Sequence, residues 1–409
     1  MRLFVYEFVT GGGFLGGGWG WPPESLLREG AAMARAVRAD LAAIGTETVG
    51  VLDDRLGETS MAADGPQSER STEYPIRRTQ YSRFDAAERG EMPRLWQGSR
   101  RRNAAFQRPS PAGAGFPGPG DRAVRSADEE RAAIEELAAA CDATMVIAPE
   151  FDHALLKRCR WVEAAGGRLL GPGPDVVQLA SDKQATIERL AAFGLPTPDG
   201  SIVEPGRGIP RGIDYPAVGK PLLGAGSQGV RLLADRAAAE AWWAGLSGPG
   251  RLERFCPGLA ASVAVLCGPA GVFPLLPCRQ RLSGDGRFVY QGGSLPLEAP
   301  LAHRAADLAA RCVAALPGAM GYLGVDLVLG ADHDGRDDVV IEINPRLTTS
   351  YVGLRAAVAD DSNLAAAIVA EGEGRRPRLS FRGVEVQCEA VGRCGEIGVG
   401  NQEFEVGSP

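Results

Sequence analysis

Histidine and paired cysteines are scarce in this sequence. There are three histidines, His153, His303 and His333, and none belongs to a motif, so we expect each to be incidental to function. The eight cysteines include no C-x-x-C pair and fit no zinc-binding pattern. We therefore expect small, buried, reduced thiols in a cytoplasmic protein.

The sequence also lacks an excess of positive charge and a secretory signal. Its formal net charge of -7 gives no electrostatic reason to expect nucleic acid or an anionic membrane as a partner. No basic stretch followed by an apolar run opens the chain. The run Phe255–Cys278 is uncharged, but its prolines and the turn signal at Gly268–Gly271 predict two buried strands joined by a turn.

The sequence has 409 residues, 44% hydrophobic and 23% charged, which is typical of a soluble protein with two or three domains. Strands and helices alternate in its first part. We expect strands over Leu3–Phe8, Thr48–Leu52 and residues 143–151, and helices over Pro22–Ile44, Ser126–Ala140 and Asp152–Ala165. This alternation predicts a small parallel sheet in an α/β N-terminal domain made of residues 1–53 and 126–175.

Regular patterns lapse between residues 54 and 125. This stretch is rich in Arg, Ser, Gly and Pro, and its apolar residues follow no period, which predicts a flexible insertion. Strands that pair through short turns then give residues 176–375 an α+β character. Residues 376–409 show no pattern that places them, and we treat them as a C-terminal tail.

A glycine-rich stretch, YEFVTGGGFLGGGWGW, follows the first expected strand. Gly11, Gly13 and Gly16 satisfy G-x-G-x-x-G, the pattern of a dinucleotide-binding turn. The acid that such a site needs about 20 residues further on is misplaced, since Asp53 and Asp54 come about twice as far along. Three interpretations stay open: a nicotinamide site, a turn that closes a sheet edge, and a mobile loop that contacts substrate.

A second glycine-rich loop lies in VGKPLLGAGSQGVRLL, from Val218 to Leu233. A strand carrying Lys220 enters the loop and another strand leaves it. Backbone N–H groups of such a hairpin can cradle phosphates, and the lysine can reach the phosphate oxygens. A plain hairpin turn is the alternative. The stretch does not match a nucleophile elbow, because Ala225 stands where a glycine is needed and the loop joins two strands.

The sharpest pattern combines two acidic strands. Asp326 lies in the strand Tyr322–Leu329, and Glu342 and Asn344 share one face of the strand that begins at Val339. A solvated hairpin does not explain an acid and an amide in an otherwise apolar strand. Two carboxylates and an amide are hard oxygen ligands that suit Mg²⁺, with Mn²⁺ as an alternative.

These motifs resemble the ATP-grasp superfamily of carboxylate–amine ligases over about residues 171–354. The resemblance implies an ATP-grasp fold after a Rossmann-like domain, with ATP and Mg²⁺ as cofactors. The implied nucleotide-binding residues are Lys183, Lys220, Gly224, Gly226, Ser227, Gln228, Gly229 and the hinge residues Glu253, Arg254 and Phe255. The implied metal ligands are Asp326, Glu342 and Asn344, and Arg346 matches an arginine near the transferred group. Ala260 and Ala261 depart from the pattern, since many members have a ribose-binding acid there.

Three short stretches, MRLFVYEFVTGGG, VYQGGSLP and EINPRLTTSYVGL, are similar to the subfamily of tyramine–L-glutamate ligases. That resemblance implies a role in methanofuran-type cofactor biosynthesis, within one-carbon metabolism. It places the opening loop on the substrate side. The implied substrate residues are Glu7, Thr10, Gly12, Thr348 and Thr349. Gln280 follows a strand toward the expected cleft and is a candidate for binding the acid substrate. Arg281 follows a strand toward the expected cleft and is a candidate catalytic residue, with a surface role as the alternative.

The sequence therefore predicts an ATP-dependent ligase that joins a carboxylate, L-glutamate, to an amine such as tyramine through an acyl phosphate. Another small-molecule carboxylate–amine ligase is the alternative within the class. A nicotinamide-dependent oxidoreductase is the alternative outside it. The expected partners are small molecules, with neither nucleic acid nor membrane, and the oligomeric state stays open, a homodimer included.

Overall fold

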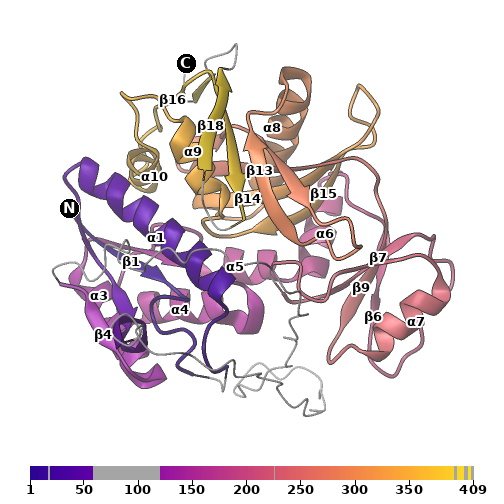
Figure 1. Ribbon diagram of the computed structural model, residues 1–409, viewed down its shortest axis with the longest axis horizontal. Coiled ribbons are helices and arrows are strands. Elements are labelled where there is room, and N and C mark those ends of the chain that lie inside the picture. Colours follow the sequence, from indigo (N-terminus) through magenta and orange to yellow (C-terminus); the bar gives the residue numbers. More distant parts are fainter. Residues whose placement is uncertain (17–18, 59–119, 225, 391–393, 400–403, 407–409) are drawn as a thin grey trace, which may run out of the picture.

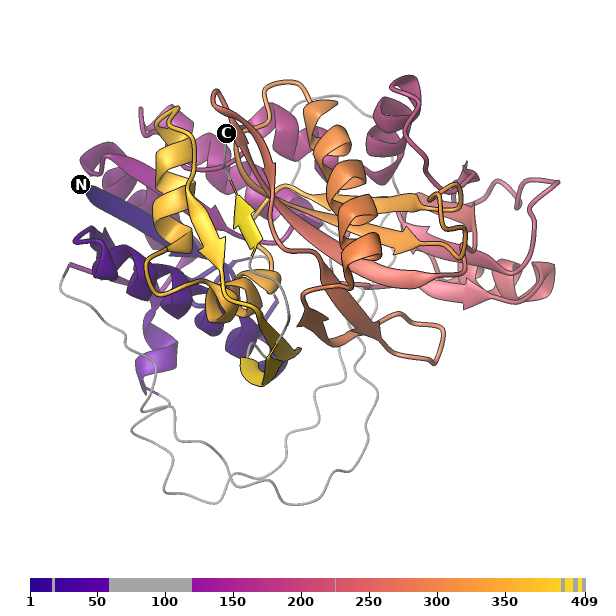
Figure 2. The same ribbon diagram turned by 90° about the horizontal axis from the view of Figure 1, so that it is seen from above.

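The protein is described by a computed structural model that has a parallel N-terminal unit, a small antiparallel sheet and a large antiparallel sheet. The residues that the structure describes are 1–16, 19–58, 120–224, 226–390, 394–399 and 404–406. Figures 1 and 2 both place the N-terminal unit and the small sheet at opposite ends of the molecule, with the large sheet between them.

The N-terminal unit contains a parallel sheet in the order β2-β1-β5, as the sequence predicts. Its elements are β1 (Arg2–Glu7), α1 (Glu24–Ala43), β2 (Glu47–Val49), β3 (Val51–Asp53), α2 (Asp54–Glu58), β4 (Arg122–Val124), α3 (Ala127–Ala140), β5 (Ala143–Ile147), the 3₁₀-helix η2 (Phe151–His153) and α4 (Ala154–Ala164). Helix α1 buries Met33, Val37 and Leu41, which share one face at helical spacing. Ser126 caps α3 by accepting a hydrogen bond from the Glu129 N–H.

The ends of the predicted insertion belong to this unit. Strand β4 pairs in parallel with β3, and α2 follows β3 directly. Both elements fall inside the 54–125 stretch that the sequence assigns to an insertion. The rest of that stretch, residues 59–119, lies outside the described residues, so its flexibility stays a prediction.

Two helices, α5 (Pro174–Ser181) and α6 (Lys183–Ala192), lead into the small sheet. Its strands follow the order β6-β9-β7-β8. These elements are β6 (Gly200–Val203), β7 (Ala217–Pro221), β8 (Arg231–Leu233), α7 (Arg236–Ala244) and β9 (Gly250–Arg254). A small core of Val203, Leu233 and Leu252 packs with Trp242 of α7. This sheet presents Lys220 and Glu253 toward the rest of the protein.

The large sheet has the order β15-β14-β10-β12-β13-β17-β18, and β11 pairs with β10. Its strands are β10 (Leu259–Gly268), β11 (Gly271–Pro274), β12 (Cys278–Leu282), β13 (Tyr290–Leu295), β14 (Gly321–Leu329), β15 (Val339–Asn344), β17 (Val384–Glu389) and β18 (Cys394–Val399). The two strands predicted within Phe255–Cys278 are β10 and β11, joined by a turn.

Alternate residues of the large sheet face different helices. Val263, Val325 and Leu327 pack against α8 (Ala299–Ala314). Ala264 and Tyr322 face the opposite way, toward α9 (Ser350–Ala357) and α10 (Leu364–Gly372). Helices α9 and α10 in turn pack on α1, so the N-terminal unit closes over this second face.

Part of the predicted C-terminal tail completes the large sheet. Strand β17 pairs with β13, and β18 pairs with β17. Strands β16 (Leu379–Phe381) and β19 (Phe404–Val406) form a separate antiparallel pair. Strands β16 and β19 have three residues each, which is too few alternations for the sequence to reveal them.

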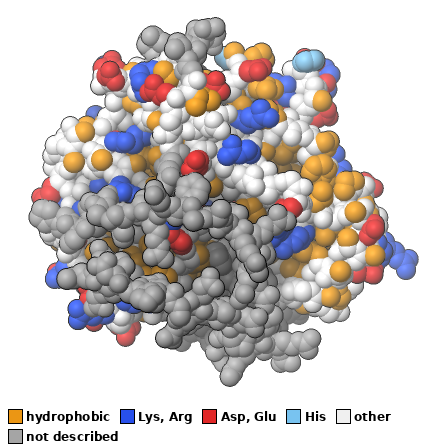
Figure 3. Space-filling view, in the orientation of Figure 1, with side chains coloured by type: hydrophobic (Ala, Val, Ile, Leu, Met, Phe, Trp, Pro, Cys, Tyr) orange, Lys and Arg blue, Asp and Glu red, His pale blue; other side chains and the backbone are white. Residues whose placement is uncertain are grey.

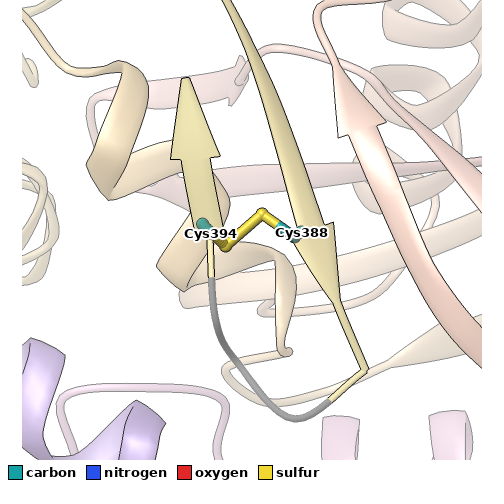
Figure 4. The surroundings of a disulfide bond; sticks show 2 residues. All are labelled: Cys388 and Cys394. Atoms are coloured by element: carbon teal, nitrogen blue, oxygen red, sulfur yellow. A yellow bond between two sulfur atoms is a disulfide. The ribbon is translucent and has the colours of Figure 1, made fainter. Parts of the chain in front are cut away.

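The expectation of reduced thiols is wrong for one cysteine pair. Cys388 and Cys394 are directly opposite on β17 and β18 and form a disulfide (Figure 4). Spacing alone does not reveal this pairing, because the strand register brings the two residues together. The remaining thiols match the expectation more closely, since Cys159, Cys267 and Cys278 are buried.

The described surface is mixed in character. On the face that Figure 3 leaves visible, acidic and basic side chains are interspersed with hydrophobic ones. Among the helices of the described residues, none is both long enough and apolar enough to cross a bilayer.

Candidate active site

Two carboxylates meet on adjacent strands of the large sheet. Asp326 of β14 and Glu342 of β15 are register partners. The Asp326 carboxylate accepts hydrogen bonds from Gln280 Nε2 and Asn344 Nδ2, each at 3.0 Å. Burial and the neighbouring Glu342 raise the pKa of Asp326 to about 6. The structure thus brings together the three predicted metal ligands, with Gln280 beside them.

The donor set of this trio fits a hard divalent cation. Two carboxylates side by side repel each other, and a cation between them would relieve that repulsion. Asn344 donates through its amide nitrogen, which leaves its oxygen for a ligand. Within the described residues no group of three or more His, Cys, Asp and Glu side chains is arranged to hold a metal. This trio has only two carboxylates, which leaves coordination positions for phosphate oxygens.

Two buried lysines lie beside Glu342. Lys183 Nζ lies 3.3 Å from Glu342 Oε2, and Lys220 Nζ lies 2.6 Å from Glu253 Oε1. Burial opposes ionisation of Glu342, but Lys183 and Lys220 outweigh it, so the pKa of Glu342 lies below its ordinary value. Glu253 also pairs with Arg251, at 3.2 Å. Positive charge for phosphate oxygens is therefore held beside the carboxylate pair.

The second glycine-rich loop is a hairpin between β7 and β8, as predicted. Its Gly224 carbonyl accepts a hydrogen bond from Lys183 Nζ at 2.9 Å. Gly226, Ser227 and Gly229 all have a left-handed backbone, with φ of 66°, 60° and 69°. The Ser227 hydroxyl donates to the Phe288 carbonyl at 2.8 Å, and Gln228 is half-buried. The hairpin therefore lies over the lysine that faces the carboxylates.

The predicted hinge follows β9. Phe255 stacks on Phe288 with ring centroids 6.3 Å apart, and Arg254 is exposed. Glu253, in contrast, is buried and occupied by its ion pairs with Lys220 and Arg251. Ala261, where the pattern of the superfamily often has an acid, is fully buried in the core against α8.

Arg346 connects the large sheet to the N-terminal unit. Its Nε lies 2.9 Å from Glu150 Oε1, and its Nη2 lies 3.1 Å from Glu150 Oε2. Burial opposes the charge of Arg346, but Glu150 outweighs it and the pKa of Arg346 lies above its ordinary value. Sequence reasoning missed Glu150. Its position could have revealed it, because Glu150 follows the carboxyl end of the parallel strand β5, and α/β domains bind ligands at that end of their strands.

The first glycine-rich loop folds around Glu7. This buried carboxylate accepts hydrogen bonds from the Val9 N–H at 3.0 Å, the Thr10 N–H at 2.8 Å and the Thr10 hydroxyl at 2.7 Å. Burial nevertheless raises the pKa of Glu7 to about 7. Gly12 has φ of 98°, which favours glycine. Contacts of Glu7 and Thr10 with substrate stay a prediction, because the hydrogen bonds that both side chains make are within the loop.

The remaining predicted residues divide between two places. Thr349 donates to Glu29 Oε1 at 2.5 Å, and Thr348 lies 2.7 Å from the Ser350 hydroxyl. Arg281 is exposed on the face of β12 opposite to Gln280 and donates to the Gln291 carbonyl at 2.7 Å. The structure therefore separates Arg281 from the carboxylate cluster, which does not favour its predicted catalytic role.

Two protein-family models match the part of the chain that contains the candidate active site and the part just before it. Residues 180–350 match the ATP-grasp domain, and residues 121–177 match the pre ATP-grasp 3 domain. The chain carries an ATP-grasp domain. The predicted fold class is confirmed: an ATP-grasp fold follows a pre-ATP-grasp N-terminal domain.

Two curated relatives share the name tyramine–L-glutamate ligase. The protein of Methanocaldococcus fervens is 25% identical over 215 residues, which are 52% of this chain and 62% of the relative. The protein of Methanocaldococcus jannaschii is 32% identical over 104 residues, which are 25% of this chain and 31% of the relative. The matches thus span less than two thirds of either relative.

Among solved structures, a putative ATP-grasp superfamily protein from Archaeoglobus fulgidus is similar in fold. The TM-score is 0.58 with 19% sequence identity, over 95% of this chain and 92% of the other. At this sequence identity the similarity supports the fold alone. The similar fold extends over nearly the full length of both chains.

Proposed function

We propose that this protein is an ATP-dependent ligase that joins a carboxylate to an amine and releases ADP and phosphate. The observation that carries the proposal is the meeting of Lys183 and Lys220 with Asp326 and Glu342 beneath a glycine-rich hairpin. A carboxylate is a poor electrophile at neutral pH. Transfer of the γ-phosphoryl group of ATP to it forms an acyl phosphate, which the amine then attacks.

Each part of the site has a role in this reaction. Lys183, Lys220 and the backbone of Gly224–Gly229 would hold the phosphates of ATP. Asp326, Glu342 and Asn344 would hold Mg²⁺, which neutralises charge on the phosphate oxygens when bound. The hairpin would exclude water, which otherwise hydrolyses the acyl phosphate.

For the substrates we propose L-glutamate and tyramine or a similar aromatic amine, with a place in cofactor biosynthesis in the cytoplasm. The printed names of the two relatives support this choice. A pair of half-buried aromatic rings, one of them on the residue after Glu150, also supports it. The rings of Trp19 and Phe151 lie 4.9 Å apart, and Phe151 follows Glu150 directly. Such rings suit an aromatic ligand.

The oxidoreductase alternative has less support. A β-carbon added at Gly13 would come within 2.4 Å of the Phe8 ring, and the Gly11 N–H donates to the Glu7 carbonyl. The loop is thus packed against its own strand, which favours a close structural turn over a dinucleotide cradle. Another small-molecule carboxylate–amine ligase stays the alternative within the class.

The test is release of ADP and phosphate with Mg-ATP, L-glutamate and a panel of amines that includes tyramine. We expect release that requires both L-glutamate and one amine, and that stops when EDTA removes Mg²⁺. Release that needs only one of the two would contradict the narrower substrate pair. No release with any acid and amine would contradict ligation itself.

A further inference from the structure

Glu29 is a half-buried carboxylate near the candidate active site, and among the described residues it has no cationic side chain at ion-pair distance. Glu29 lies on α1, and its carboxylate contacts Thr349 at the start of α9. Its partner is the neutral Thr349 hydroxyl, at 2.5 Å. In contrast, Glu150, Glu253 and Glu342 each have a cationic partner.

The charges around Glu29 include the Arg346 guanidinium, which we propose lies near the transferred group. The Glu29 carboxylate interacts electrostatically with Arg346, Tyr290 and Glu7. Tyr290 in turn interacts electrostatically with Asp326, one of the proposed metal ligands. The charge of Arg346 is already neutralised by its ion pair with Glu150. Arg346, Glu150 and Glu29 together therefore carry one net negative charge.

Two local features show that Glu29 is held in this position. Thr349 is the N-cap residue of α9, where a threonine usually accepts a bond from the helix backbone. Here its side chain makes no capping bond and donates to Glu29 instead. Gly30 lets α1 approach Glu7 closely, since a β-carbon there would lie 2.4 Å from Glu7 Oε1. A glycine inside a helix lowers the local stability of that helix, and at Gly30 it leaves room for the Glu7 carboxylate.

We propose that Glu29 binds the ammonium group of a substrate and so determines which substrates the ligase accepts. The inference rests on the proposed function. An ammonium group would supply the positive charge that Glu29 lacks and would be hydrogen-bonded by an oxygen that Thr349 leaves free. Two substrates could bring this group: the amine acceptor before it loses a proton, or an amino acid through its α-ammonium.

The experiment compares Glu29→Gln with the wild-type enzyme in steady-state turnover. Glutamine keeps the shape and can still accept the Thr349 bond, so only the charge is lost. We expect KM for one substrate to rise by about tenfold or more, since a charge-assisted hydrogen bond is removed. We expect KM for ATP to stay unchanged. Glu29→Asp keeps the charge and should recover part of the loss.

The control is Glu24→Gln, which removes an exposed carboxylate from the first turn of the same helix. It should leave every KM unchanged. The two sources of the ammonium group are separated by measuring KM for tyramine, for L-glutamate and for glutarate, which has no ammonium. A rise for tyramine alone assigns Glu29 to the amine. A rise for L-glutamate but not glutarate assigns it to the amino acid.

Two results would overturn the inference, and they can be told apart. If the wild-type enzyme turns over and Glu29→Gln leaves the KM of both substrates unchanged, Glu29 binds no substrate ammonium and the proposed function stands. If turnover by the wild-type enzyme requires no amine and no amino acid, the proposed function fails, and the inference fails with it.

Discussion

At the scale of single residues, the neighbouring carboxylates of Asp326 and Glu342 give the most direct prediction. Glu342→Gln keeps the size of the side chain but removes a charged oxygen ligand and the partner of Lys183. We expect kcat to fall by about a hundredfold or more, because metal ions contribute several kcal/mol to such reactions. The midpoint of thermal unfolding should stay close to that of the wild-type protein. Turnover and unfolding should be measured together.

The control is Asp334→Asn, which removes an exposed acid from the hairpin between the same two strands. Its turnover should match that of the wild-type enzyme. Normal turnover in Glu342→Gln would contradict the metal assignment.

Glu7 gives a prediction about pH. Its pKa is about 7 in the folded protein, above the ordinary value of 4.5. Folding therefore favours the protonated form, and the stabilisation is fully present below pH 4.5 and is lost as pH rises through 7. The loss is about 3 kcal/mol, at 1.36 kcal/mol for each pKa unit. In Glu7→Gln the free energy of unfolding should change less over this range. Denaturant unfolding at several pH values measures it, and equal pH dependence in both proteins would contradict the prediction.

At the scale of secondary-structure elements, the hairpin between β7 and β8 depends on where its glycines lie. Gly229 has φ of 69°, and a β-carbon there would lie 2.8 Å from Pro221 Cγ. Gly224 has no such neighbour and no left-handed backbone. We expect Gly229→Ala to raise KM for ATP several-fold, since alanine is strained by about 1 kcal/mol or more at such a position. Gly224→Ala should change it little.

The two variants lie in the same hairpin, and their comparison tests whether the left-handed backbone at Gly229 matters. Equal effects of Gly224→Ala and Gly229→Ala on KM for ATP would show that the left-handed backbone at Gly229 does not matter for nucleotide binding.

Elements with a strong pattern could be predicted from the sequence. The Ser126 cap, the uncharged strands β10 and β11, and the shared face of Glu342 and Asn344 all follow from local chemistry. What could not be predicted depends on register and on distant contacts. Cys388 meets Cys394 only through strand pairing, and Glu150 meets Arg346 across almost 200 residues of sequence. Arg281 failed to join the cluster because alternation along β12 turns it away from Gln280.

At the scale of the whole molecule, ion pairs join the N-terminal unit to the rest of the fold. Asp40 pairs with Arg355 of α9, and Glu150 pairs with Arg346. Glu150 and Arg346 are 5% and 15% exposed, so removing one charge leaves the other poorly solvated. We expect Glu150→Gln to lower the free energy of unfolding by about 2–4 kcal/mol and to reduce kcat as well. Denaturant unfolding and turnover measure the two effects.

The matched control is Glu136→Gln, which removes an exposed acid of the same unit that pairs with Arg122. It should change the free energy of unfolding by less than about 1 kcal/mol. If Glu150→Gln is as stable as this control, the buried pair does not hold the two parts together.

The position of the site between two parts of the fold has an evolutionary consequence. The groups proposed for phosphoryl transfer come from residues 183–344, whereas Glu29 and Glu150 come from the N-terminal unit. Mutations in the N-terminal unit can thus change which substrates bind, while residues 183–344 preserve the phosphoryl-transfer chemistry. A chain divided in this way can diversify through its N-terminal unit, and identity across such enzymes would decay faster there than around the acidic strands.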